Sequence, residues 1–210
     1  MSAAKVDRDD LQAVWAATPA EWRAWLEKHH DTQPGVWLHY YKKASGKPSI
    51  VWSEAVDEAL CFGWIDSLIR PIDDLTYRQY FAPRKPTGTW SAVNKAKIER
   101  LIAEGRMTAA GLAAIDRAKA NGSWEAIDSV EAMTLPAELE AALDANPRAR
   151  TWFDGLSKTP RWSMLHWINA AKRPQTRQER IDEVVRCAAE ERLPDRFRQR
   201  RSARSDAGPA

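Results

Sequence analysis

The stretch that decides the fold is residues 59–83, Ala-Leu-Cys-Phe-Gly-Trp-Ile-Asp-Ser-Leu-Ile-Arg-Pro-Ile-Asp-Asp-Leu-Thr-Tyr-Arg-Gln-Tyr-Phe-Ala-Pro. Residues 65–72 and 75–81 are rich in β-branched and aromatic side chains, and Asp73-Asp74 separates them. This combination predicts an antiparallel hairpin. Pro83 ends the second strand, because proline cannot donate a ladder hydrogen bond.

One further strand and several helices are expected around this hairpin. Thr18-Pro19 begins a helix, since threonine caps a first turn and proline suits its first position. Residues 36–43 are rich in strand-forming side chains. From Trp90 onward apolar residues recur at helical spacing. Caps and breakers there predict helices over residues 91–103, 108–120, 136–145, 157–171 and 174–191, with one more beginning at Asn146-Pro147.

This order of elements predicts an α+β protein. A small N-terminal α+β domain with an antiparallel sheet is expected over residues 15–88. An all-helical region follows over residues 89–193. Residues 194–210 are rich in arginine and serine and poor in apolar residues, so they are expected to form a disordered basic tail.

Composition limits the class of protein. The 210 residues are 44% hydrophobic, carry a net charge of +3 and include 11 tryptophans, enough for one good core or two small ones. No run of 18 apolar residues occurs, so no membrane-spanning helix is expected, and the N-terminus does not resemble a secretory signal. Two distant cysteines fit a reducing compartment. The expected location is the cytoplasm.

Five residues within and after the hairpin make the best candidate ligand-binding site: Trp64, Asp66, Arg78, Arg84 and Trp90. A carboxylate in a strand-like run is costly unless it is paired, and Arg78 or Arg84 can supply the partner. One interpretation is a structural ion pair. The other is an Asp–Arg pair lining a cleft beside the two tryptophans, where arginine can bind a carboxylate or phosphate of a ligand. The sequence leaves both interpretations open.

Cys61, His29, His30 and His166 are expected to have structural roles. Cys61 lies near a helix C-terminus, where a thiolate is disfavoured, so a buried structural cysteine is expected. His29 and His30 point in different directions on a helix, which favours C-terminal capping over metal binding. His166 lies among apolar residues and fits a packed core histidine. No zinc, serine-hydrolase or phosphate-loop motif occurs, and we expect neither a metal nor another cofactor.

Residues 84–97 interleave cations with aromatic side chains, a mixture that nucleic-acid grooves use. The cations are few, and no nucleic-acid-binding module follows them. Nucleic-acid binding is therefore less favoured than the binding of a small ligand or a protein.

Short motifs along most of the chain point to a known family. The chain carries His30-Asp31, Val36-Trp37-Leu38, Ala59-Leu-Cys-Phe-Gly-Trp-Ile-Asp66, the segment from Tyr77 to Trp90, Leu101-Ile-Ala-Glu-Gly-Arg-Met-Thr108, Gly111-Leu112, Ala171-Lys172, Thr176-Arg177 and Arg180-Ile181. From about Trp22 to Leu193 it resembles the YdeI/OmpD-associated family, also called bacteriocin-protection proteins. Tyr80 departs from the family pattern, in which arginine and threonine often flank the phenylalanine, so Arg78 and Arg84 remain the candidate cations.

The resemblance implies a link with resistance to bacteriocins or antimicrobial peptides and with an outer-membrane porin, and it implies no particular reaction. The leading hypothesis is a cytoplasmic binding protein of a bacterial stress or peptide-resistance system, with catalysis less favoured. Its partner is an unknown small anionic ligand or a protein. The first alternative is an enzyme acting on a small anionic substrate, with Asp66 as general base and Arg78 as anion clamp. The second is a nucleic-acid-binding regulator. A homodimer is left open.

Overall fold

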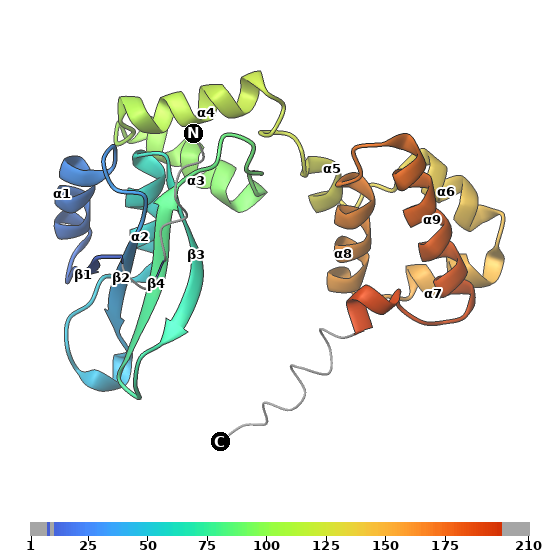
Figure 1. Ribbon diagram of the computed structural model, residues 1–210, viewed down its shortest axis with the longest axis horizontal. Coiled ribbons are helices and arrows are strands. Elements are labelled where there is room, and N and C mark those ends of the chain that lie inside the picture. The colour runs from blue at the N-terminus through green and yellow to red at the C-terminus, as the bar shows by residue number, and fades with distance from the viewer. Residues whose placement is uncertain (1–7, 9–10, 199–210) are drawn as a thin grey trace. The chain divides into compact units, whose positions relative to one another are not determined.

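The chain folds into two compact units, Met1–Glu125 and Ala126–Ala210. The computed structural model describes residue 8 and residues 11–198 of the 210 (Figure 1). The first unit combines a sheet with helices, and the second is helical, which confirms the predicted mixture of helix and strand. Within the described residues, no helix combines the length and apolar character needed to cross a membrane.

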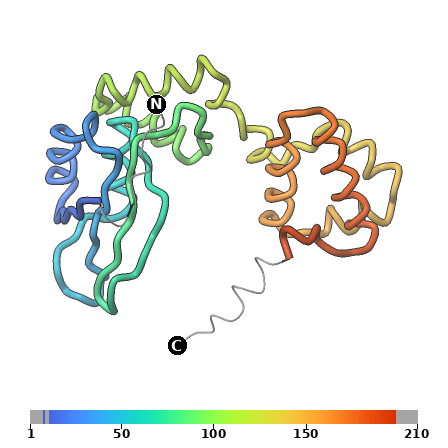
Figure 2. Tube along the Cα trace, viewed as in Figure 1, coloured from blue at the N-terminus to red at the C-terminus, as the bar shows by residue number. Residues whose placement is uncertain are grey.

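A four-stranded mixed sheet forms one layer of the first unit, in the order β1-β2-β4-β3. The strands are β1 (Ala13–Trp15), β2 (Val36–Tyr41), β3 (Trp64–Pro71) and β4 (Thr76–Pro83). β3 and β4 form the predicted antiparallel hairpin, and Figure 2 shows β4 running beside β2, with which it also pairs antiparallel.

The prediction of an antiparallel sheet was wrong at one edge, because β1 pairs parallel with β2. β1 has only three residues, too few for an alternation of exposed and less exposed side chains to stand out in the sequence. Strand prediction depends on alternation over four to eight residues, so the sequence does not reveal this strand.

The two faces of the sheet differ because side chains alternate along each strand. The inner face carries Val36, Leu38 and Tyr40 of β2, and Tyr77, Gln79 and Phe81 of β4. The outer face carries Trp37, His39 and Tyr41 of β2, with Arg78 and Tyr80 of β4. The helices α1 (Pro19–His29), α2 (Trp52–Cys61), α3 (Ala92–Ala103) and α4 (Ala109–Ala120) add side chains to the core at the inner face.

Local signals explain where the first helices begin and end. Thr18 accepts a hydrogen bond from the Glu21 backbone N–H at 3.3 Å, and Pro19 occupies the first turn of α1, as predicted. Gly63 has φ +73, the left-handed conformation that follows the end of α2 and leads into β3. Trp22 of α1 then packs edge-on against Phe81 at the centre of the core, with 5.4 Å between ring centroids.

The second unit is a bundle of α5 (Asp128–Glu131), α6 (Ala137–Asp144), α7 (Pro147–Asp154), α8 (Lys158–Asn169) and α9 (Pro174–Ala189). Asn146 caps α7 by accepting a hydrogen bond from the Ala149 N–H at 3.2 Å, as the Asn146-Pro147 pair indicated. Leu139, Phe153, Leu165, Ile168 and Ile181 are buried in its core. Fully burying a side chain of this size stabilises a fold by roughly 1.5–3 kcal/mol.

The division between the units differs from the domain boundary expected at residue 88. α3 and α4 belong to the first unit, because Ile98, Leu101 and Ile115 are buried in the same core as the sheet. Part of the tail expected to be disordered, residues 195–198, forms a helical turn, and Phe197 packs against the core of the second unit. The remainder of that tail, residues 199–210, lies outside the described residues.

Candidate anion-binding site

Four polar side chains come together at the inner face of the sheet, and we call them the polar cluster: Tyr40, Asp66, Gln79 and Arg84. β2, β3 and β4 supply the first three, and Arg84 directly follows β4. Asp66 faces Phe81 across the ladder, and Phe81 and Gln79 are alternate residues of β4. Asp66 therefore projects to the same face as Gln79.

The Asp66 carboxylate accepts two hydrogen bonds through Oδ2. Gln79 Nε2 donates the first, and the indole Nε1 of Trp52 donates the second at 3.1 Å. Both donors are neutral, so neither offsets the negative charge of the carboxylate. Asp66 is also close enough for its charge to act on the ionisation of Arg84 and Tyr40.

The Arg84 guanidinium lies over an aromatic ring, and two of its nitrogens have no acceptor among the described residues. Its Cζ is 3.5 Å from the centroid of the Trp90 ring. Nη2 donates to the Thr89 carbonyl at 2.7 Å. Nε and Nη1 are buried and have no hydrogen-bond partner among the described residues. Buried donors without an acceptor destabilise a fold, so this arrangement calls for an explanation.

The buried environment of Arg84 disfavours the charged form of its side chain. Burial lowers the pKa of Arg84 to about 10, although the Asp66 carboxylate acts in the opposite direction. The side chain still carries its proton at neutral pH. A bound anion would give Nε and Nη1 the acceptors they lack and would favour the charged form, since hydrogen bonds between ions are the stronger kind.

Two more atoms of the polar cluster are buried without partners among the described residues, Tyr40 Oη and Gln79 Oε1. Burial, followed by Tyr77 and the charge of Asp66, raises the pKa of Tyr40, so its hydroxyl stays protonated and can donate. Gln79 Oε1 can only accept. The polar cluster thus offers donors from Arg84 and Tyr40 and an acceptor from Gln79 to a polar ligand.

The structure brings together three of the five predicted site residues, namely Asp66, Arg84 and Trp90. Trp64 has a packing role instead. It is 1% exposed, and its Nε1 donates to the His30 carbonyl at 3.0 Å.

Arg78 lies on the opposite face of the sheet from Asp66, so these two residues do not form the predicted pair. The Arg78 guanidinium is 4.3 Å from the centroid of the Trp37 ring on the outer face. The enzyme hypothesis needs Asp66 and Arg78 at one substrate, and this geometry separates them.

Tyr40, Gln79 and Trp52 are not among the site residues predicted from the sequence. One signal was available, because Gln79 is a polar residue between two aromatic residues at alternate positions of a strand. A buried amide at such a position needs partners, and it can therefore mark a polar site. Trp52 gives no comparable signal, since its contact with Asp66 joins a helix to a strand.

Cys61, Cys187, His30 and His166 have structural roles in this fold. Cys61 and Cys187 are unpaired and buried, and burial raises the pKa of both thiols, which fits the predicted structural cysteine. His30 follows the end of α1, and its Nδ1 contacts the Leu26 carbonyl at 2.9 Å, as expected for C-terminal capping. His166 stacks on Trp162 at 4.8 Å. In the part of the chain that the structure describes, no group of three potential metal ligands is found.

The segment from residue 84 to residue 97 offers little for base stacking. Trp90 is 2% exposed, and its ring contacts Arg84 on one side and Trp124 at 5.0 Å between centroids. Lys97 pairs with Asp57. A nucleic-acid groove needs exposed ring faces beside available cations, and Trp90 does not present one.

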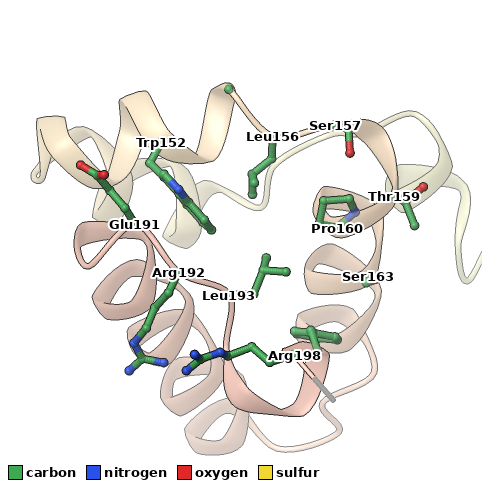
Figure 3. A pocket seen from close by; sticks show the side chains of 12 residues that line it. Trp152, Leu156, Ser157, Thr159, Pro160, Ser163, Glu191, Arg192, Leu193 and Arg198 are labelled. Atoms are coloured by element: carbon green, nitrogen blue, oxygen red, sulfur yellow. The ribbon is translucent and has the colours of Figure 1, made fainter. Parts of the chain in front are cut away.

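The second unit contains a half-open hollow of about 1120 Å³ (Figure 3). Its apolar walls come from Trp152 of α7, Leu156 in the connection after α7, Pro160 of α8, and Leu193 and Phe197 after α9. Arg192 and Arg198 lie at one end, and both pair with Asp195. The hollow can therefore hold an apolar group next to positive charge.

Comparison with protein families gives a different result for each unit. Residues 132–191 match the family described as "Bacteriocin-protection, YdeI or OmpD-Associated". The resemblance to this family is confirmed for these residues. Residues 14–114 match a separate model, a domain of unknown function (DUF8412). No curated protein matches the chain, and no solved structure matches it.

The bacteriocin-protection match is shorter than the expected range from Trp22 to Leu193. Of the motifs that suggested the family, only Ala171-Lys172, Thr176-Arg177 and Arg180-Ile181 lie inside the matched residues. The motif at residues 59–66 lies in the domain of unknown function. The polar cluster and the family match therefore belong to different units.

Proposed function

We propose that the protein is a binding protein of a bacterial system that protects against bacteriocins, and that its first unit binds a small anion at Arg84. The family match of residues 132–191 supports the role in protection. The two buried, unpartnered nitrogens of Arg84, Nε and Nη1, carry the proposal of anion binding. Because these donors are buried, the ligand is a small carboxylate or phosphate rather than a large polyanion.

Replacing Arg84 by glutamine tests the anion site. With inorganic phosphate and acetate as probes, we expect calorimetric titration of the full chain to show binding of at least one of them. Arg84→Gln should weaken that binding by about tenfold to a hundredfold, because a hydrogen bond to a charged group is worth roughly 1.5–3 kcal/mol. The same variant should largely keep the stability of the unliganded chain, because removing a buried charge offsets the loss of its contacts with Thr89 and Trp90.

The matched control is Arg78→Gln. Arg78 also lies against a tryptophan ring, but on the other face of the sheet. Its replacement should leave the affinity for phosphate and acetate within about twofold. The anion site is refuted if neither probe binds, or if both arginine variants weaken binding equally. A fall in stability with Arg84→Gln and no change in affinity would show that Arg84 is structural.

Survival of bacteria tests the role in protection. Expressing the chain in a bacteriocin-sensitive strain should raise the fraction of cells that survive a bacteriocin challenge. Ser163 lines the hollow of the second unit, so Ser163→Trp places an indole there without touching the first unit. Loss of protection in Ser163→Trp but not in Arg84→Gln would assign protection to the matched unit alone, and the reverse would assign it to the anion site. No gain in survival with the unaltered chain would count against a protective role.

We also propose that the protein acts in the cytoplasm. The support is that Cys61 and Cys187 are both unpaired and belong to different units. Unpaired thiols are typical of reducing compartments. Cell fractionation with an antibody to the chain tests this location.

A further inference from the structure

A second hollow, of about 620 Å³, is lined by residues of the β3–β4 turn and its neighbours. Figure 1 shows this turn at the end of the sheet. We call the hollow the aromatic depression. Its lining residues come from β1, from β2 and the loop that follows, and from the hairpin tip: Trp15, His39, Tyr41, Ser45, Lys47, Ile72, Asp73, Asp74, Leu75 and Thr76. It belongs to the outer face, whereas the polar cluster belongs to the inner face.

Aromatic rings form the wall of this depression. The Trp15 ring lies 4.6 Å from Tyr41 and 4.7 Å from His39, measured between centroids. Trp15 is 47% exposed, so part of its ring is open to solvent. The faces of such rings are negative and attract cations, tryptophan most strongly.

A cation of the protein itself already occupies part of the depression. The Lys47 ammonium lies over the Tyr41 ring, with Nζ 4.9 Å from the centroid. No ion pair of Lys47 is found among the described residues, so the ring is the contact that holds it there. An ammonium group on a flexible alkyl chain therefore suits this wall, and Lys47 shows the kind of group that fits.

His39 supplies a buried acceptor beside the same rings. Both of its ring nitrogens are buried without a hydrogen-bond partner among the described residues. Burial and the charge of Arg78 lower the pKa of His39, so the ring is neutral at pH 7. A neutral imidazole has one nitrogen that can accept a hydrogen bond, and it does not repel a cation.

Carboxylates and apolar side chains of the hairpin tip complete the surface. Asp73 Oδ1 accepts a hydrogen bond from the Leu75 N–H at 2.8 Å, and chiefly for this reason the pKa of Asp73 is lowered. Asp74 has no hydrogen-bond or ionic partner in the described part of the chain. Ile72 and Leu75 are 46% and 49% exposed. The depression thus combines negative charge, aromatic faces and apolar surface.

We propose that the aromatic depression binds the lysine side chain of an extended partner peptide, with its ammonium group displacing Lys47 from Tyr41. Asp74 and the rings of Trp15 and Tyr41 hold the ammonium group. Ile72 and Leu75 contact apolar neighbours of that lysine. This site is independent of the anion site at Arg84.

A pair of matched peptides tests the proposal. The probe is acetyl-Leu-Lys-Leu-amide, and the control is acetyl-Leu-norleucine-Leu-amide, which keeps the length and apolar character but lacks the charge. Titration of the full chain is followed through the indole N–H signal of Trp15 in two-dimensional NMR spectra, assigned with Trp15→Leu. We expect the lysine peptide to shift this signal and to bind at least fivefold more tightly than the norleucine peptide.

Four variants make the test specific. Asp74→Asn should weaken binding severalfold. Trp15→Leu should do the same, with its titration followed through the backbone N–H signal of Leu75 because the indole signal is absent. Lys47→Ala should tighten it by about threefold, because it removes the cation that competes for Tyr41. Arg84→Gln should leave it unchanged, so failure here can be told from failure of the anion site. Equal affinity for both peptides, or weaker binding with Lys47→Ala in a chain whose spectrum is otherwise unaltered, would overturn the proposal.

Discussion

Replacing Gly111 by alanine is expected to lower the free energy of unfolding of the first unit by about 2–3 kcal/mol, at the upper end of what overpacking costs. A Cβ added at Gly111 would lie 2.2 Å from the carbonyl oxygen and 2.8 Å from the carbonyl carbon of Cys61. Both atoms belong to the backbone, so no side-chain rotation can relieve the contact. α4 would have to move away from the end of α2.

That movement would break more than one contact. The Cys61 carbonyl, at the last residue of α2, also accepts hydrogen bonds from Thr108, the residue that caps α4. The Thr108 backbone N–H donates at 3.1 Å and its hydroxyl at 2.6 Å. Gly111, one turn further on, allows the two helices to approach closely enough for both bonds. Separating them would leave a buried carbonyl with fewer donors.

The expected destabilisation is opposite in direction to the usual effect of replacing a helical glycine by alanine. In an ordinary helix, glycine to alanine stabilises by roughly 0.5–1 kcal/mol, because alanine has the higher helix propensity. Urea denaturation followed by tryptophan fluorescence measures the difference. Gly155→Ala is the control, since a Cβ there meets only ordinary contacts at 3.5 Å and φ is negative. If Gly111→Ala is neutral or stabilising, the close approach of α2 and α4 is wrong.

Local signals in the sequence predicted most of the elements, and the faces of the sheet were harder to predict. Near the hairpin turn, Arg70 faces Arg78 and Ile69 faces Gln79. Continued without interruption, this register would place Asp66 opposite Ala82, on the same face as Arg78. That face is the one that the predicted Asp66–Arg78 pair requires.

A bulge in β3 explains why the predicted pair does not form. The register shifts by one residue between Asp66 and Ile69, so that Asp66 faces Phe81 and projects to the inner face. A shift of one residue moves a side chain to the other side of a sheet. Bulges have no reliable signal in a single sequence. Arg84, the second candidate partner, follows the strand that pairs with β3 and lies close enough to Asp66 for the carboxylate to act on its pKa.

The sequence did not predict that α3 and α4 belong to the first unit, and the reason is different. The apolar pattern of α3 and α4 shows that each helix has a buried face, but it does not show which core receives that face. Ile98 and Leu101 could have packed against later helices equally well on sequence grounds. Only the tertiary contacts assign them to the core at the sheet.

Replacing Glu58 by alanine is expected to lower the free energy of unfolding of the first unit by about 3 kcal/mol. The Glu58 side chain is 6% exposed and binds two arginines, Arg23 Nη1 at 2.9 Å and Arg106 Nη2 at 2.5 Å. The Arg23 guanidinium also donates to the Arg106 carbonyl at 3.1 Å. Removing one partner of a buried ion pair costs roughly 3–5 kcal/mol, since the remaining charge is left without compensation. Both arginines are partly exposed, which places the effect at the lower end of that range.

Glu104→Ala is the matched control, because Glu104 also binds Arg106 but is 38% exposed. An exposed ion pair contributes little to stability, so this variant should lose much less than Glu58→Ala in urea denaturation. Glu58→Gln separates charge from shape. It keeps the volume and can still accept one hydrogen bond, so its loss should be smaller than that of Glu58→Ala. Equal losses for Glu58→Ala and Glu104→Ala would mean that the buried carboxylate does not hold α1 to the loop after α3, and that apolar packing alone joins them.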